Sequence, residues 1–225
     1  MTTIGRVFAE AYRLRLMRGL EETLYDAGYG SVAGVDEVGR GSLAGPVVAA
    51  AVVVERGRLV PGVDDSKSLS PQKRERLAEV IRAAHPRHAV ASVSPRDIDR
   101  INILEATRLA MSQALHGLEP APDLAVVDAV SLPGCKVPVL SVVRGDQVSY
   151  AVACASILAK VERDRHMVEL DARFPHYGFA AHKGYGAAVH RQALRDHGPC
   201  EVHRLTFRSV LPRADVPKRR ARGGR

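Results

Sequence analysis

The chain has 225 residues, of which 46% are hydrophobic and 26% are charged, a composition typical of a folded globular protein. Its longest run without a charged or strongly polar side chain, residues 43–54, contains Gly45 and Pro46 and is too short and too interrupted to span a bilayer. The formal net charge is +8, but residues 212–225 carry six Lys or Arg and one Asp, so the preceding chain carries only +3. This Pro-, Gly- and Arg-rich tail is typical of a disordered basic extension, which is either simply solvated or holds nucleic acid without sequence preference.

The two ends and the cysteines exclude several classes of protein. Arg and Glu interrupt the apolar residues of the N-terminus, so it lacks the apolar core of a secretory signal. Three widely spaced cysteines without a C-x-x-C pair predict neither a disulfide framework nor a zinc knuckle. We therefore expect a cytoplasmic protein with reduced cysteines and no contact with a membrane.

In chain order, the first half of the sequence predicts helices around a hairpin. Apolar residues recur at helical spacing over 4–27, and a strand that ends near Gly39 follows. A β-branched run over 46–54 predicts the second strand, and the short link containing glycine indicates a hairpin. Ser70 and Pro71 have the residue types of a helix N-cap and first turn. A strand over 88–93 and one long helix over 97–118 complete this half.

The second half alternates short apolar runs with helical patterns. Residues 124–130 and 137–146 predict buried strands, residues 150–170 a helix, and residues 185–196 one more helix. A hairpin followed by alternating strands and helices favours an α/β fold, with a mixed sheet covered by helices and a partly helical C-terminal portion.

Four carboxylates lie near the predicted ends of three strands: Asp36 and Glu37, then Asp128, then Asp146. Chemistry gathers at the carboxyl ends of parallel strands, so these side chains are expected to converge on one edge of the sheet. Like charges this close destabilise the fold unless a cation sits among them, and Mg²⁺ or Mn²⁺ prefers such oxygen ligands. Two such ions can hold a phosphodiester for hydrolysis.

The pairing of Asp36 with Glu37 poses a geometric difficulty, because adjacent residues of a strand face opposite sides of the sheet. Either the strand bulges or ends there, or Glu37 acts from the side or through its backbone carbonyl, with Asp36 as the central ligand. Each acid taken alone has an ordinary alternative: a charge pair at a strand end for Asp36 and Glu37, or a cap or turn residue for Asp128 and Asp146.

Six segments, in order and spread over residues 33–207, together resemble ribonuclease HII: "AGVDEVGRGSLAGPVVAAAVV", "DDSKSLS", "INILEAT", "VVDAV", "VVRGDQVSYAVACASILAKVERD" and "FPHYGFAAHKGYG". The resemblance implies the ribonuclease H-like fold, a mixed five-stranded sheet flanked by helices, with a helical C-terminal extension. It implies hydrolysis of the RNA strand of RNA/DNA hybrids, and nicking of duplex DNA 5′ of an embedded ribonucleotide, leaving 3′-hydroxyl and 5′-phosphate ends.

The same resemblance assigns roles to residues of this chain. It places the catalytic acids, which hold two Mg²⁺ or Mn²⁺ ions, on Asp36, Glu37, Asp128 and Asp146. It places the reading of the ribose 2′-hydroxyl on the backbone of Gly39, Arg40 and Gly41, phosphate binding on Ser66 and Lys67, and packing on the deoxyribose after the junction on Tyr185. Lys160, Arg163 and Lys183 are further phosphate contacts or solvated side chains.

Some features of the C-terminal part stand outside this assignment. Ala187 replaces the Thr expected after "KGYG", which could loosen a contact near Tyr185. The late histidines fit no zinc template, and we expect them on the surface or near phosphates: His176, His182, His190, His197 and His203.

The expected organisation is an N-terminal helix over 1–30 packed on the catalytic domain, a catalytic core over 31–170, a helical extension of the same domain over 171–211 and the tail over 212–225. A monomer suffices for this chemistry. The alternative functions are a ribonuclease H-fold nuclease of other specificity, and a non-catalytic protein that binds hybrids.

Overall fold

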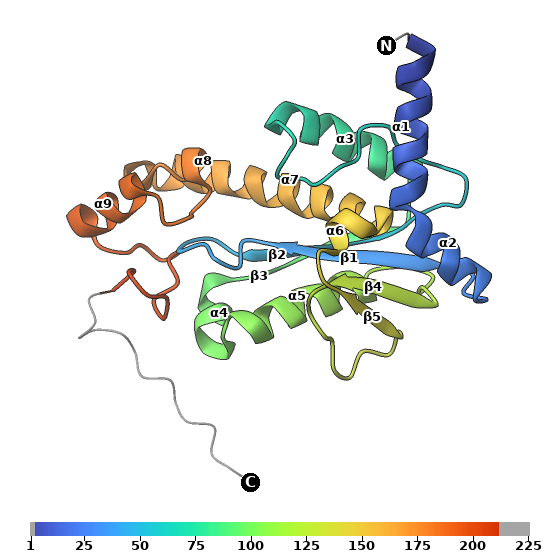
Figure 1. Cartoon of the computed structure of the whole chain (residues 1–225). Coiled ribbons are helices and arrows are strands. Elements are labelled where there is room, and N and C mark those ends of the chain that lie inside the picture. Colours follow the sequence, from blue (N-terminus) through green and yellow to red (C-terminus); the bar gives the residue numbers. More distant parts are fainter. Residues whose placement is uncertain (1–2, 212–225) are drawn as a thin grey trace.

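A computed structural model describes residues 3–211, and the predicted basic tail, residues 212–225, lies outside the described residues. Its centre is a five-stranded sheet with the strand order β3-β2-β1-β4-β5 (Figure 1). The strands are β1 Val32–Val38, β2 Val47–Val53, β3 His88–Val93, β4 Leu124–Asp128 and β5 Val139–Val142. β2 pairs antiparallel with both β1 and β3, whereas β4 pairs parallel with both β1 and β5. The predicted hairpin and mixed sheet are confirmed.

Helices cover both faces of this sheet (Figure 1). Their bounds are α1 Thr3–Met17, α2 Gly19–Asp26, α3 Pro71–Ala84, α4 Pro95–Ile101, α5 Ile103–His116, α6 Gly145–Val148, α7 Tyr150–Arg173, α8 Phe179–His182 and α9 Ala188–His197, with a 3₁₀ turn at Pro175–Tyr177. The long helix α7 packs with α3 on one face, and α5 packs on the other. No helix among the described residues is long and apolar enough to cross a membrane.

Close packing of α7 on β1 depends on one small residue. A Cβ atom at Gly34 would lie 2.1 Å from the backbone carbon of Ala151, so only glycine allows this approach. The N-terminus of α7 is fixed at the same level, because the buried Glu21 of α2 accepts hydrogen bonds from Ala151 N at 2.8 Å and from the Ser149 hydroxyl. The start of α7 is therefore held both by the sheet and by the N-terminal helices.

The predicted N-terminal helix is wrong in one respect, because it is two helices. α1 ends at Met17 and α2 begins at Gly19, and the buried Arg18 between them donates to the carbonyls of Glu55 and Arg58. Leu14 joins the core, whereas the first turns of α1 project from the body (Figure 1) and expose Ile4, Val7, Phe8 and Tyr12. The apolar residues predicted to line one helix over 4–27 therefore pack against the protein body only in the C-terminal part of that range.

The predicted helix over 97–118 is also two helices. Asn102 lies between α4 and α5 with a positive φ of 78°, and its side chain accepts hydrogen bonds from Leu104 N and Glu105 N. Asparagine tolerates this conformation and caps the helix that follows. Periodicity alone hid the break, because both helices turn apolar residues towards the same cluster.

The C-terminal part forms its own apolar cluster beside the end of α7, built around Phe179, Met167 and Leu194. Two of the histidines expected at the surface are buried here, because His190 and His203 are 0% and 2% exposed. The predicted helix 185–196 begins only at Ala188, so Tyr185 lies in the turn between α8 and α9.

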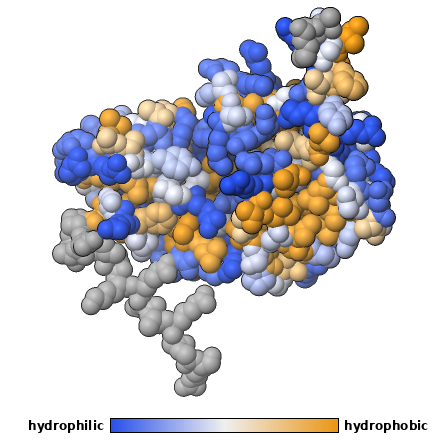
Figure 2. All heavy atoms as spheres, in the orientation of Figure 1, coloured by the Kyte–Doolittle hydropathy of each residue, from blue (hydrophilic) through white to orange (hydrophobic). Residues whose placement is uncertain are grey.

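The edge of the sheet formed by β5 has apolar side chains at the surface. Figure 2 shows apolar side chains gathered over β4 and β5, where Val143 is 76% exposed. β5 is only four residues long and half-buried, which is a common form for an edge strand. The strands predicted over 124–130 and 137–146 are shorter in the structure, where β4 ends at Asp128 and β5 covers only Val139–Val142.

Candidate active site

Asp36 and Asp128 lie side by side at the carboxyl ends of two parallel strands. The register pairs Val35 of β1 with Val127 of β4, so the next residues along both strands are these two acids. Both share the face of the sheet that α7 covers, since Gly34 and Val126, two positions earlier, face that side. Parallel strands lie about 4.8 Å apart, which brings the two carboxylates into one cluster.

Glu37 lies on the opposite face of the same strand. β1 keeps a regular register with β2 through Glu37 and Val38, so the bulge considered as one alternative does not form. The Glu37 carboxylate reaches the strand end from the side, where its Oε1 lies 3.3 Å from Arg40 Nη1. The alternatives in which Glu37 acts from the side or through its backbone carbonyl stay predictions.

Asp146 comes from a single helical turn instead of a strand. β5 ends at Val142, and Asp146 lies in α6, where it is 6% exposed. The Asp128 carboxylate fixes this turn, because its Oδ1 accepts a hydrogen bond of 2.7 Å from Gly145 N. One acid of the predicted set thus positions the backbone that presents another.

The four acids are electrostatically coupled. Burial, the Glu37 carboxylate and the Asp128 carboxylate raise the pKa of Asp36 to about 8, against a hydrogen bond from Ser156. Burial also raises the pKa of Glu37, against Arg40, and the pKa of Asp146, against Lys67. Asp128 contributes to all three rises. Burial and mutual repulsion therefore favour the protonated form of these acids unless further positive charge is supplied.

This donor set fits a hard divalent cation that a substrate helps to bind. Within residues 3–211, no three His, Cys, Asp or Glu side chains close around a metal ion by themselves. However, the crowded carboxylates need positive charge, and Glu37 Oε2 is buried with no hydrogen-bond partner among the described residues. Mg²⁺ is commonly bound by one or two carboxylates and completes its shell with water and substrate oxygens.

The loop after β1 contains two glycines with different surroundings. A Cβ atom at Gly39, which has a φ of +93°, would lie 2.1 Å from Arg163 Nε, so this position requires glycine within the protein itself. A Cβ atom at Gly41 would meet nothing within 4 Å. The space at Gly41 is open, as a site that a ligand approaches would need.

The loop of Ser66 and Lys67 borders the acids. Lys67 is 82% exposed, and its Nζ lies 3.8 Å from Asp146 Oδ2. The Ser66 hydroxyl is buried and hydrogen-bonded to the Ser156 hydroxyl at 2.9 Å, so it points to α7 instead of to solvent. Sequence reasoning missed Ser156, which connects this loop to Asp36; its position on an alanine-rich helix gave no signal.

Tyr185 has a 40% exposed side chain, and the guanidinium of Arg163 lies 5.6 Å from its ring centroid. Arg163 was one of the further phosphate contacts considered, but it is fully buried and donates to the carbonyls of Ala44, Pro46 and Lys183. It therefore supports the loops and does not face solvent. Lys160 pairs with Asp164 within α7.

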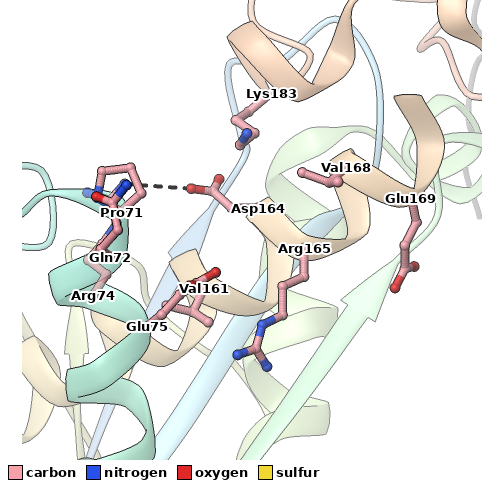
Figure 3. A pocket seen from close by; sticks show the side chains of 10 residues that line it. All are labelled: Pro71, Gln72, Arg74, Glu75, Val161, Asp164, Arg165, Val168, Glu169 and Lys183. Carbon is pink, nitrogen blue, oxygen red and sulfur yellow. Dashed lines mark ion pairs between the residues drawn. The ribbon is translucent and has the colours of Figure 1, made fainter. Parts of the chain in front are cut away.

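A groove of about 520 Å³ runs between α3 and α7 (Figure 3). Arg165, Lys183, Glu75 and Glu169 line it, and Asp164 pairs with Arg74 across it. None of the four acids borders this groove. Its mixed charges favour no single class of ligand.

The chain is similar to known proteins over most of its length. The family model described as Ribonuclease HII matches residues 33–210. A ribonuclease HII of Caldicellulosiruptor bescii is 49% identical over 188 residues, which are 84% of this chain and 91% of that protein.

Two solved structures are similar in fold. The ribonuclease H2 of Pyrococcus horikoshii matches with a TM-score of 0.71 and 27% identity, over 80% of this chain and 95% of that chain. A PCNA:RNase HII complex from Archaeoglobus fulgidus matches with a TM-score of 0.63 and 32% identity, over 73% of this chain and 85% of that chain. With this ribonuclease H-like fold, the order of its sequence motifs and the coverage of its relatives, the chain belongs to the ribonuclease HII family of endonucleases.

Proposed function

We propose that the chain nicks duplex DNA on the 5′ side of an embedded ribonucleotide and cleaves the RNA strand of RNA/DNA hybrids, leaving 3′-hydroxyl and 5′-phosphate ends. The observation that carries this proposal is the coupled cluster of Asp36, Glu37, Asp128 and Asp146 beside the open Gly41. A protein that only binds polyanions gains nothing from four clustered acids, which repel phosphate.

The acids are proposed to hold two divalent cations, Mg²⁺ or Mn²⁺. When bound, such ions supply positive charge to the attacking and leaving oxygens of a phosphodiester hydrolysis. Asp36 and Asp128 offer neighbouring carboxylates on one face. Glu37 offers from the other face an oxygen that has no hydrogen-bond partner within residues 3–211, and Asp146 is presented by the turn that Asp128 fixes. No covalent intermediate with the protein is required.

Substrate selection is proposed to come from the loops around the acids. The 2′-hydroxyl is both a donor and an acceptor, and the backbone at Gly39, Arg40 and Gly41 can approach it closely where no side chain intervenes. Lys67, exposed beside Asp146, supplies a phosphate contact, and Ser66 contributes through the placement of its loop. The exposed ring of Tyr185 packs on a deoxyribose, which an additional hydroxyl would crowd.

Three end-labelled duplexes test the proposal: all-DNA, DNA with one ribonucleotide, and an RNA/DNA hybrid, each with and without Mg²⁺ or Mn²⁺. We expect metal-dependent nicking 5′ of the single ribonucleotide and cleavage of the hybrid, with the all-DNA duplex intact. Cleavage of all-DNA would indicate a nuclease of other specificity, and binding without cleavage would indicate a non-catalytic protein.

The acids are tested by Asp36→Asn and Asp128→Asn. Each replaces a carboxyl group, which can ionise beside a cation, by an amide of nearly the same shape, which cannot. We therefore expect a loss of cleavage of at least about 100-fold with duplex binding largely kept. Circular dichroism checks the fold, and Asp123→Asn, at the other end of β4, is the matched control. Full activity in either active-site variant would contradict the assigned roles.

A further inference from the structure

The guanidinium of Arg204 is buried in an unusual way. Its side chain is fully buried, and it donates to backbone carbonyls: Nη1 to Arg40 O at 2.9 Å, and Nε and Nη2 to Gly45 O at 3.0 and 2.8 Å. Burial and the nearby Arg163 lower the pKa of Arg204 to about 9, so the side chain is still charged at neutral pH. A buried charge is costly, and a fold that only needed packing could use an apolar side chain here.

The carbonyls that Arg204 binds flank one loop. Residues 39–46 lead from β1 to β2, and Arg204 holds both the Arg40 carbonyl at its start and the Gly45 carbonyl near its end. The backbone adds a third link, because Arg204 N donates to Leu43 O at 2.9 Å. A planar fork of donors can fix several carbonyls at once, which a flexible ammonium cannot do.

The same segment reaches the turn that carries Tyr185. Cys200 N donates to His203 Nδ1 at 3.0 Å, which leaves the proton of His203 on Nε2, 3.0 Å from His190 Nε2. His190 then carries its proton on Nδ1 and donates to Tyr185 O at 2.8 Å. Each nitrogen of this pair thus has a defined role in a chain of hydrogen bonds.

The two loops are also in direct contact. Leu43 N donates to Gly184 O at 2.8 Å, and a Cβ atom at Gly184 would lie 2.5 Å from Ala44 O. The loop of Gly39, Arg40 and Gly41 and the turn of Tyr185 are therefore close neighbours. Arg163 bridges them within the body of the protein, and the dipeptide His203 and Arg204 adds hydrogen bonds that lead to both from the C-terminal segment.

We propose that Arg204, with the His203 and His190 pair, is a positioning element. It sets the distance between the loop that reads the ribonucleotide and the Tyr185 ring that packs on the following sugar. This distance determines the preference for a ribonucleotide–deoxyribonucleotide junction. This inference rests on the proposed function and adds the residues that hold the loop after β1 and the turn of Tyr185 in place relative to each other. None of the three side chains touches the substrate in this assignment.

The measured quantity is the junction preference, defined as kcat/KM on duplex DNA with one ribonucleotide divided by kcat/KM on an all-RNA/DNA hybrid. Partial unfolding lowers both rates equally, so this ratio does not respond to a merely structural role. We expect Arg204→Lys, which keeps the charge but cannot span both carbonyls, to lower the junction preference about tenfold. Leu115→Ala, which opens the apolar cluster between α5 and the other face of the sheet, a cluster with no residue of either loop, should lower the melting temperature and leave the ratio unchanged.

A double variant tests whether Arg204 acts through Tyr185. Tyr185→Ala alone should lower the junction preference, and adding Arg204→Lys should lower it no further, because the ring to be positioned is gone. Where Arg204→Lys does not fold, His190→Leu removes the hydrogen bond to the Tyr185 carbonyl from the other side and carries the same expectation.

The outcomes separate the inference from the function it rests on. Active variants whose junction preference stays within twofold of the parent, or effects of Arg204→Lys and Tyr185→Ala that multiply independently, would overturn the inference and leave the proposed function standing. A parent protein that cleaves neither duplex would overturn the proposed function, and the inference with it.

Discussion

Gly39 and Gly41 are separated by one residue, yet the protein needs them for different reasons. Gly39 makes room for Arg163, so its absence of a side chain is explained by packing inside the protein. Gly41 makes room for nothing in the protein, since its Cβ position is open and its backbone conformation is ordinary. Because Gly41 lies in the loop that directly follows Asp36 and Glu37, its open Cβ position leaves room for a ligand to approach the backbone there.

This difference gives a prediction for Gly41→Ala. An added methyl group costs the fold little here, so the free energy of unfolding should change by less than about 0.5 kcal/mol. Cleavage 5′ of a ribonucleotide should fall at least about tenfold, because the methyl group obstructs the backbone that reads the 2′-hydroxyl. Urea unfolding and end-label cleavage measure the two effects.

Gly19→Ala is the matched control for this prediction. Its Cβ position is also open, but it lies at the start of α2, away from the acids. It should leave cleavage unchanged. Normal activity in a folded Gly41→Ala variant would show that the open space is not used by the substrate.

Among the elements, α9 shows the structural consequence of alanine at position 187, where threonine is expected. Ala187 occupies the N-cap position of α9, with extended backbone angles and no side-chain hydrogen bond to the first turn. Threonine, the residue expected there, would place a hydroxyl where it accepts from a backbone N–H. The helix behind Tyr185 therefore begins without a cap.

Restoring the cap should stabilise the protein. Ala187→Thr is expected to raise the free energy of unfolding by about 1 kcal/mol. Ala187→Val has nearly the same shape without the hydroxyl and should give no gain. Equal stabilisation by both variants would show that added apolar contact, and not the cap, is responsible.

Elements were predicted best where one pattern was uninterrupted. The strand over 88–93 and the helix starting at Pro71 lie where expected, because turn residues bound the first and an N-cap signal marks the second. The helices broken at Arg18 and Asn102 were not separated, because an apolar stripe continues across both breaks. Tertiary hydrogen bonds of Arg18 and a local cap by Asn102 decide these positions.

For the whole molecule, stability should depend on pH through buried histidine. Burial, with smaller contributions from Arg18 and Arg58, lowers the pKa of His85 from 6.5 to about 4. A lowered pKa means that the unfolded chain takes up the proton first as the pH falls. The stabilisation by neutral His85 is therefore complete above about pH 6.5 and is lost progressively towards pH 4.

Comparison with His85→Gln isolates this contribution, since other titrating groups cancel between the two proteins. The advantage of the parent protein over the variant should shrink by about 2 kcal/mol between pH 7.5 and pH 5 in urea unfolding. The exposed His116→Gln should show no such trend. A difference between parent and His85→Gln that is constant over this range would contradict the prediction.

The charge of the whole molecule gives a second prediction, which concerns the tail. Residues 212–225 carry six basic side chains, and each phosphate contact makes binding weaker as salt rises. Truncation after Val210 should therefore flatten the plot of log affinity for a duplex against log salt concentration, with the cleavage site unchanged. An identical slope for the truncated and full chains would show that the tail does not touch the substrate.

The sequence by itself predicted the fold class and the order of the strands, because periodicity and turn residues are local in the chain. Its motifs marked the four acids as candidates. It predicted that the acids converge, but only strand register decides that Asp36 and Asp128 share one face while Glu37 keeps to the other without a bulge. Nor could it reveal that Arg204 reaches the Arg40 carbonyl, 164 residues earlier in the chain, while His203 reaches the turn of Tyr185 through His190. Contacts between distant segments depend on the packing of the whole chain, and only the tertiary structure decided them.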